Sequence, residues 1–133
     1  MIYFVSGHRD LTQEEFDEHY VPMINDIMNN DPFTEFVVGD WEGCDTMVID
    51  YLLNRFDYPP ITIYHVEEQP RVKFGNESVL KFKDIFSIKL PSYDDCDKQM
   101  TFDSKFDVAW IRPGRENSHT AMNIKRRFNL KTF

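Results

Sequence analysis

The chain has 133 residues, which is the length of one domain, and its hydrophobic fraction of 41% is ordinary for a protein with a buried core. The net charge of −8 argues against general nucleic-acid binding, because a phosphate backbone is recognised by a basic surface. No apolar run approaches the roughly 20 residues of a membrane span and no basic leader precedes the first one, so we expect a soluble, cytoplasmic protein.

Cysteine and histidine placement indicates no metal site. Cys44 and Cys96 lack a paired spacing, and in a reduced cytosol we expect both to be buried free thiols. The four histidines are scattered and none lies in a metal-ligand motif, so we predict no structural metal. The sequence implies no cofactor.

The first third of the chain predicts alternating strands and helices. Residues 2–5 form an apolar run that is typical of a strand buried on both faces. Thr12 and Glu15 form a capping box that begins a helix with one apolar face, and Pro22 is expected to kink or split this helix. Residues 36–38 predict a second short strand.

The alternation continues through the middle of the chain. A turn at residues 39–43 leads into apolar residues at helical spacing, which Pro59 and Pro60 bring to an end. The β-branched run 61–66 predicts a third strand. A helix is expected from residue 94 to residue 101.

Residues 67–93 are ambiguous. Segments 79–82 and 85–90 fit either edge strands or an insertion that packs on the core. A lid and a dimer contact are both open as roles for this region.

The end of the chain supplies a last strand and a last helix. The apolar run 108–111 is broken by Pro113, and Asn117 or Ser118 then caps a helix that extends to about Arg127. The order β-α-β-α-β-(insert)-α-β-α predicts a single α/β domain over residues 1–133, a Rossmann-like three-layer fold with a mainly parallel sheet.

In such a sheet, ligands bind beyond the carboxyl ends of the strands, where three loops are candidates. In the first loop, Gly7 lets the backbone approach a ligand, Ser6 offers a hydroxyl, and Arg9 has a guanidinium suited to phosphate. An equally open alternative is a tight turn in which Arg9 pairs with a neighbouring acid. His8 is a candidate acid–base group or a plain hydrogen-bonding residue.

The second loop contains two glycines, Gly39 and Gly43, around Asp40 and ahead of Asp45. Asp45 either caps the following helix or accepts hydrogen bonds from ribose hydroxyls. Asp97, on the helix before the last strand, is expected to face the loops and to orient Arg9 or a ligand hydroxyl.

The third loop leads from a buried strand into a helix whose first amides lack intrahelical partners, which favours an anion. The alternative is an ordinary capped helix. The basic residues 125–127 are interpreted as a solvated helix end. The candidate phosphate-binding residues of this loop are Arg112, Pro113, Gly114, Arg115, Asn117, Ser118, His119 and Thr120.

Four segments together resemble the SLOG superfamily of Rossmann-like domains, which groups the DNA-processing protein DprA/Smf with the Lonely Guy cytokinin-activating enzymes. The last of them is the most specific, because a strand, Pro-Gly, Asn-Ser-x-Thr and a helix follow one another. These segments are residues 2–12, 37–51, 97–101 and 106–127.

The resemblance implies a nucleotide-derived ligand with its phosphate near Gly114 and residues 118–120. It places other parts of the ligand near Ser6, Gly7, Gly39 and Asp45. Many members form dimers, so a homodimer is expected. Members with glycosidase activity carry a catalytic glutamate at a position where this chain has Asn123, and Glu116 lies elsewhere in the loop.

Three functions stay open. The leading one is a nucleotide-binding module: a sensor, carrier or sponge. The second is a nucleotide N-glycosidase or deoxyribosyltransferase, which needs a carboxylate near the anomeric carbon and a proton donor. Its candidates are Asp45, Asp97, Glu116, His8 and His119. The third is a structural partner protein that associates through exposed aromatic residues, with Phe102, Phe106, Phe128 and Phe133 as candidates.

Overall fold

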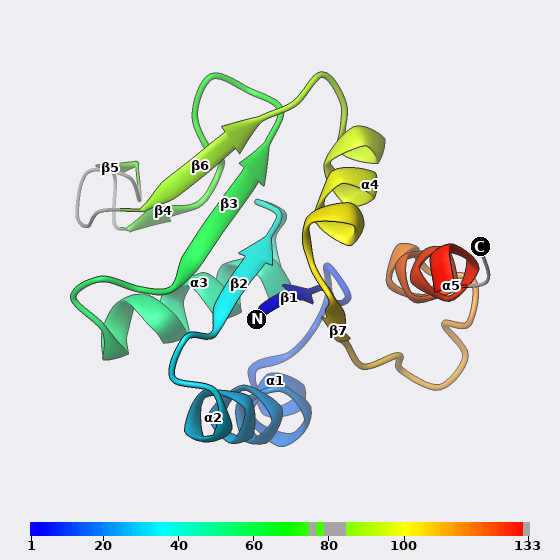
Figure 1. Cartoon of the computed structure of the whole chain (residues 1–133), viewed down its shortest axis with the longest axis horizontal. Coiled ribbons are helices and arrows are strands. Elements are labelled where there is room, and N and C mark those ends of the chain that lie inside the picture. Colours follow the sequence, from blue (N-terminus) through cyan, green and yellow to red (C-terminus); the bar gives the residue numbers. More distant parts are fainter. Residues whose placement is uncertain (75–76, 79–84, 132–133) are drawn as a thin grey trace.

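A computed structural model describes residues 1–74, 77–78 and 85–131 of the chain. Strands and helices alternate along most of it (Figure 1). In chain order the elements are β1 (Ile2–Val5), α1 (Gln13–His19), α2 (Val21–Asn30), β2 (Glu35–Val38), α3 (Cys44–Arg55), β3 (Ile61–His65), β4 (Lys73–Phe74), β5 (Glu77–Ser78), β6 (Phe86–Lys89), α4 (Tyr93–Asp103), β7 (Phe106–Val108) and α5 (His119–Lys131).

Five strands form a parallel sheet in the order β6-β3-β2-β1-β7. Tyr3 in β1 pairs with Phe36 on one side and with Phe106 on the other, so β1 lies in the interior of the sheet. The short strands β4 and β5 form a separate antiparallel pair within the connection from β3 to β6. The α/β fold with a mainly parallel sheet is therefore confirmed.

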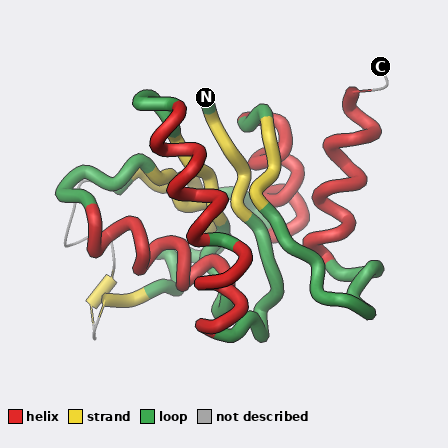
Figure 2. The backbone as a smooth tube through the Cα atoms, turned by 90° about the horizontal axis from the view of Figure 1, so that it is seen from below, coloured by secondary structure: helices red, strands yellow, loops and turns green. Residues whose placement is uncertain are grey.

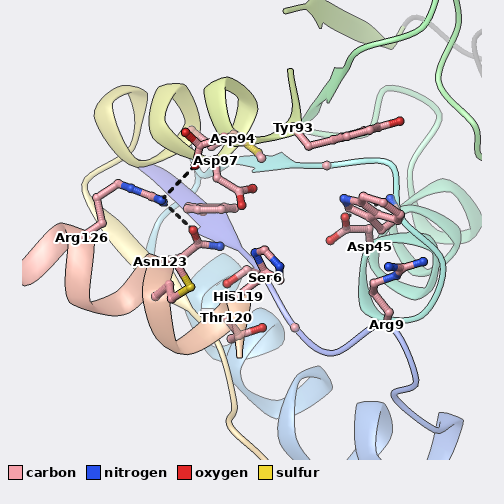
Figure 3. Close-up of a pocket in the computed structure, with 16 residues that line it drawn as sticks. Ser6, Arg9, Asp45, Tyr93, Asp94, Asp97, His119, Thr120, Asn123 and Arg126 are labelled. Atoms are coloured by element: carbon pink, nitrogen blue, oxygen red, sulfur yellow. Dashed lines mark hydrogen bonds and ion pairs between the residues drawn. The ribbon is translucent and has the colours of Figure 1, made fainter. Parts of the chain in front are cut away.

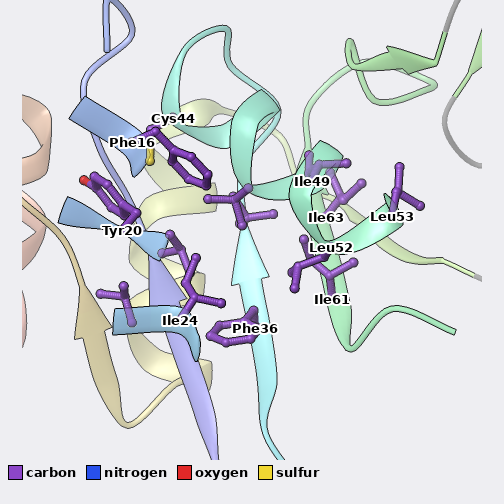
Figure 4. Packing of buried hydrophobic residues seen from close by; sticks show 14 of the residues in the cluster. Phe16, Tyr20, Ile24, Phe36, Cys44, Ile49, Leu52, Leu53, Ile61 and Ile63 are labelled. Atoms are coloured by element: carbon purple, nitrogen blue, oxygen red, sulfur yellow. The ribbon is translucent and has the colours of Figure 1, made fainter. Parts of the chain in front are cut away.

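Alternate side chains of each strand point to opposite faces of the sheet. Helices cover both faces (Figure 2). Val5, Phe36 and Ile63 pack with buried residues of α1, α2 and α3 (Figure 4). Phe4 and Tyr64 pack on the other face with residues of α4, and α5 lies beside α4. The molecule is a three-layer, Rossmann-like domain.

The expected first helix is two helices. Thr12 caps α1 through the predicted capping box with Glu15, with both hydrogen bonds present. Pro22 lies in the first turn of α2, where a missing amide hydrogen is tolerated. Tyr20 separates the two helices, as predicted from the position of the proline.

The last strand is earlier in the chain than residues 108–111. It spans Phe106–Val108, because the following residues leave the sheet to bond side chains instead. The amide of Trp110 donates to the Tyr20 hydroxyl (3.0 Å), and the amide of Arg112 donates to His8 Nε2 (2.8 Å).

The last helix is longer than predicted and continues to Lys131. Arg127 is not part of a solvated helix end. It is buried, its Nε lies 2.9 Å from Asp107 Oδ2, and it donates to the carbonyl of Ser104 (2.9 Å). This ion pair fixes α5 against the start of β7.

The ambiguous region contributes an edge strand, since β6 pairs in parallel with β3. The expected segment 79–82 and the candidate interface residue Phe133 lie outside the described residues. Phe102 and Phe128 are exposed. Cys44 and Cys96 are buried and free. No described helix combines the length and the apolar character that crossing a bilayer requires.

The strand order places a topological switch beside β1. The chain leaves β1 toward β2 through helices on one face, whereas β7, on the other side of β1, leads into α5 on the opposite face. A crevice at the carboxyl ends of the strands is the expected binding position in such sheets.

Candidate functional site

A cavity of about 160 Å³ opens at the carboxyl ends of β1 and β2, between α4 and α5 (Figure 3). It draws residues from three predicted regions: the loop after β1, the loop after β2, and the start of α5. The lining residues are Phe4, Ser6, Gly7, Arg9, Gly39, Trp41, Asp45, Tyr93, Asp94, Asp97, Met100, His119, Thr120, Met122, Asn123 and Arg126.

Ser6 presents a free hydroxyl at this cavity. The residue is 6% exposed, and its Oγ is buried without a hydrogen-bond partner among the described residues. A buried hydroxyl without a partner is costly, because its hydration is lost and nothing replaces it. A ligand with a polar group here would remove that cost.

Asp45 is the most buried carboxylate of the cavity, with 8% of the residue exposed. Its Oδ2 accepts a hydrogen bond from the amide of Trp41 (3.1 Å). Burial raises the pKa of Asp45 to about 7, and the carboxylates of Asp97 and Asp40 add to the increase. Near neutral pH this side chain can therefore either donate or accept a proton.

Asp97 is the second carboxylate, as predicted from its place on α4. Burial also raises the pKa of Asp97, whereas Arg126, His119 and a hydrogen bond with Asn123 act in the opposite direction. Arg126 itself donates to Asn123 Oδ1 (2.6 Å) and lies 3.9 Å from Asp94. Arg126 thus belongs to the cavity and not to the solvated helix end that the sequence suggested.

The glycines of the first two loops are required by the packing and the backbone conformation of the loops themselves. A Cβ on Gly7 would lie 2.5 Å from both Cys44 Sγ and the Tyr20 hydroxyl. A Cβ on Gly39 would lie 2.8 Å from Asp45 Oδ2. Gly43 has a φ of +80° and precedes α3 as its cap residue. These positions hold the loops close to α1 and α3, and Gly43 is not in the cavity lining.

The start of α5 contributes His119 and Thr120 to the cavity. Ser118 caps the helix, because its Oγ accepts from the amide of Ala121 (3.2 Å). The amides of His119 and Thr120 have no backbone acceptor among the described residues, at the end of the cavity that these two residues line.

The preceding residues, 112–117, are not brought to the cavity. Arg112 donates to Glu15 Oε2 (2.9 Å) and lies 3.2 Å from Asp10, and Arg115 donates to Asp10 Oδ2 (2.7 Å). Bonding to Arg112 lowers the pKa of Glu15 to about 2. Both arginines are thus neutralised by acids of the chain itself.

The rest of this loop also lies apart from the cavity. Glu116 is exposed and accepts from the amide of Gly114 (3.1 Å), so it is a poor candidate for catalysis. Pro113 and Asn117 are exposed and line no part of the cavity. These residues form the turn between β7 and α5.

His8 does not face the cavity either. It is 3% exposed, and its Nε2 accepts the hydrogen bond from the Arg112 amide. Burial lowers the pKa of His8, with further contributions from Arg112 and Arg115, which keeps the ring neutral. The side chain joins the first loop to the third, so its role is structural.

Asp40 is buried and pairs with a residue that the sequence did not single out. It accepts from Nη2 of Arg71 (2.8 Å) and from the Arg71 amide (3.0 Å). Trp41 and Tyr93, which were also not predicted, line the cavity near this pair. Trp41 could have been predicted as a site residue, because it follows the end of a strand. Arg71 and Tyr93 lie in the ambiguous region 67–93.

No group of three or more potential metal ligands occurs among the described residues. Comparisons of the chain with protein-family models, with curated proteins and with solved structures found no match. The similarity to the SLOG superfamily therefore stays a prediction that rests on the four sequence segments.

Proposed function

We propose that this chain binds a nucleotide or a nucleotide-derived phosphosugar in the cavity between α4 and α5, as a sensor, carrier or sponge. The observation that carries the proposal is the set of polar groups there: the free hydroxyl of Ser6 and the carboxylates of Asp45 and Asp97. Carboxylates accept hydrogen bonds from ribose hydroxyls in dinucleotide-binding folds.

The size of the cavity fits one part of such a ligand. Pockets that enclose a whole drug-sized ligand measure about 300–1,000 Å³, and this cavity is smaller. The polar groups suit a sugar, so we expect the sugar to be enclosed and the base and phosphate to extend outward. The resemblance to SLOG domains, many of which form dimers, adds a homodimer to the proposal, and light scattering would test that part.

Isothermal titration calorimetry against AMP, ADP-ribose, NAD and cyclic nucleotides tests the proposal. We expect at least one to bind, and Asp45→Asn to weaken that binding about tenfold, because the amide replaces one of the two acceptor oxygens with a donor NH₂ group and removes the negative charge. Glu116→Gln is the matched control and should bind like the wild type. The absence of binding by all four at high micromolar concentration would contradict the proposal.

Cleavage of the ligand is a second candidate, favoured by one observation. Asp45 and Asp97 share the cavity, and burial raises the pKa of both. One protonated and one ionised carboxyl form a general acid and a charge stabiliser. The C1′–N bond would break as the base takes a proton from Asp45, with Asp97 stabilising the positive charge, and water would then add its hydroxyl to C1′ and give its other proton back to the Asp45 carboxylate.

Incubation with a nucleotide panel, followed by chromatography for free base, tests this second candidate. Asp45→Asn and Asp97→Asn should each reduce the rate by about 100-fold, the lower range for loss of a general acid or base. His8→Gln and Glu116→Gln should have little effect, because neither side chain lines the cavity. A chain that binds nucleotide and releases no base is a binding module only.

A further inference from the structure

Two arginines approach the ring of Trp41 at the edge of the cavity. The guanidinium carbon of Arg9 lies 4.0 Å from the ring centroid, and that of Arg71 lies 3.9 Å from it. Arg71 also lies 4.5 Å from the ring of Tyr93. Both guanidinium groups thus stack on the same indole ring, which places two positive charges at one edge of the cavity.

Neither arginine is saturated by the protein. The side chain of Arg9 is 59% exposed, and its acidic partner among the described residues is Glu42, at 3.4 Å and 75% exposed itself. Such an exposed pair contributes little and is easily displaced. Asp40 accepts from Nη2 of Arg71, whereas Nε of Arg71 is buried without a hydrogen-bond partner among the described residues.

The other cationic side chains near the site also have partners in the fold. Arg112 and Arg115 are held by Asp10 and Glu15 at 2.6–3.2 Å. Arg126, at the opposite end of the cavity from Arg9 (Figure 3), donates to an amide oxygen and faces the carboxylates of α4. The end with Arg9 and Arg71 is therefore the better place for an anion.

A second cavity, of about 310 Å³, lies on this side of the site and has room for such a group. Arg9 and Trp41 line both cavities, and Arg71 lines the second. A ligand whose sugar occupies the first cavity can thus extend past Arg9 toward Arg71. Two acids also line the second cavity, and of these Asp40 is already bound to Arg71, whereas Glu42 is exposed.

We infer that Arg9 and Arg71, placed around Trp41, bind the phosphate of the ligand in this second cavity. The inference rests on the proposed function for the position of the sugar. It moves the phosphate away from residues 112–120, where the sequence suggested it, and assigns a role to part of the region between β3 and β6.

The ratio of nucleoside to nucleotide dissociation constants isolates the phosphate contribution. Calorimetry with the four ribonucleoside 5′-monophosphates and their nucleosides gives this ratio for the wild type. Arg9→Gln should reduce it about tenfold, as expected for loss of a charge-assisted hydrogen bond, with a much smaller change in nucleoside affinity than in nucleotide affinity. Arg71→Lys, which keeps the charge beside Asp40, should reduce it by a smaller factor.

Arg115→Gln is the matched control, because Arg115 lies outside the cavity, and Arg126→Gln tests the opposite end of the cavity; neither should change the ratio. A ratio near one in the wild type, or a ratio lost in Arg126→Gln and kept in Arg9→Gln, would overturn the inference while leaving the proposed function in place. Inorganic pyrophosphate is the separate probe. Its binding to the wild type and not to Arg9→Gln would support the anion subsite even if every nucleotide failed to bind, and no binding of any probe would overturn both proposals.

Discussion

The loops after β1 and β2 and the loop after β7 contain the same kinds of residue but differ in what their charges do. The first two contribute Ser6, Arg9 and Asp45 to a cavity. In the third, Arg112 and Arg115 are bonded to Asp10 and Glu15. The comparison indicates that glycine, hydroxyl and arginine in one loop suit an anion only where the arginine of that loop is not held by several acids: Arg9 has one exposed partner at 3.4 Å, whereas Asp10 and Glu15 hold Arg112 and Arg115.

The comparison depends on how tightly each loop is packed, which glycine substitutions test. Gly7→Ala should destabilise the protein by about 3 kcal/mol, because its Cβ would overlap buried atoms of Cys44 and Tyr20. Gly114 has a φ of +90°, and a Cβ added there would meet no atom within 4 Å, so Gly114→Ala should cost only about 1 kcal/mol. Urea denaturation gives both values, and equal losses would show that the two loops are packed alike.

The contributions of Asp45 in the cavity and of Glu15 beside the loop after β7 to the free energy of unfolding should change with pH in opposite directions. Burial raises the pKa of Asp45 from 3.8 to about 7, so the folded protein keeps this proton when the unfolded chain has lost it. Stability from this group therefore falls as pH rises from about 4 to about 7. Glu15, held by Arg112, has a pKa of about 2, and its contribution is lost only as the pH falls below the ordinary value of 4.5.

The substitution Asp45→Asn removes the pH dependence of stability that comes from the buried carboxyl group. Relative to the wild type, the variant should gain on the order of 2 kcal/mol between pH 4.5 and pH 7.5, measured by urea denaturation at each pH. Glu116→Gln, at an exposed position outside the cavity, is the control. If the curves of Asp45→Asn and the wild type stay parallel over this range, the buried carboxyl is ionised throughout.

The smallest effect is expected at Ser118, which the sequence placed in the anion site. Its hydroxyl caps α5, so Ser118→Ala should cost about 1 kcal/mol of stability and leave nucleotide affinity unchanged. Denaturation and calorimetry on the same variant measure the two effects. If the loss of binding free energy exceeded the loss of unfolding free energy, Ser118 would contact the ligand, as the sequence suggested.

Local patterns were sufficient to predict most of the fold. The apolar run at 2–5, the capping box of Thr12 and the position of Pro22 each specify a backbone conformation within a few residues. The last strand was misplaced because Trp110 and Arg112 bond to side chains far away in the sequence. Such bonds have no local signature.

The candidate site was predictable only in part for the same reason. Ser6, Asp45 and Asp97 follow from strand ends and a helix face, and all three line the cavity. The partners of Arg112 lie about 100 positions away in the sequence, and only the fold brings them together. Arg71 lies in a region without a clear pattern, so its pairing with Asp40 could not be predicted.

The central claim is that the ligand lies in the cavity between α4 and α5 and not on the loop after β7. A titration of the ¹⁵N-labelled protein with AMP, followed by amide chemical shifts, tests it residue by residue. We predict the largest shifts at Gly7, Gly39 and Thr120, with little change at Gly114 and Glu116. Shifts concentrated at residues 112–117, with the first three amides unchanged, would contradict the account.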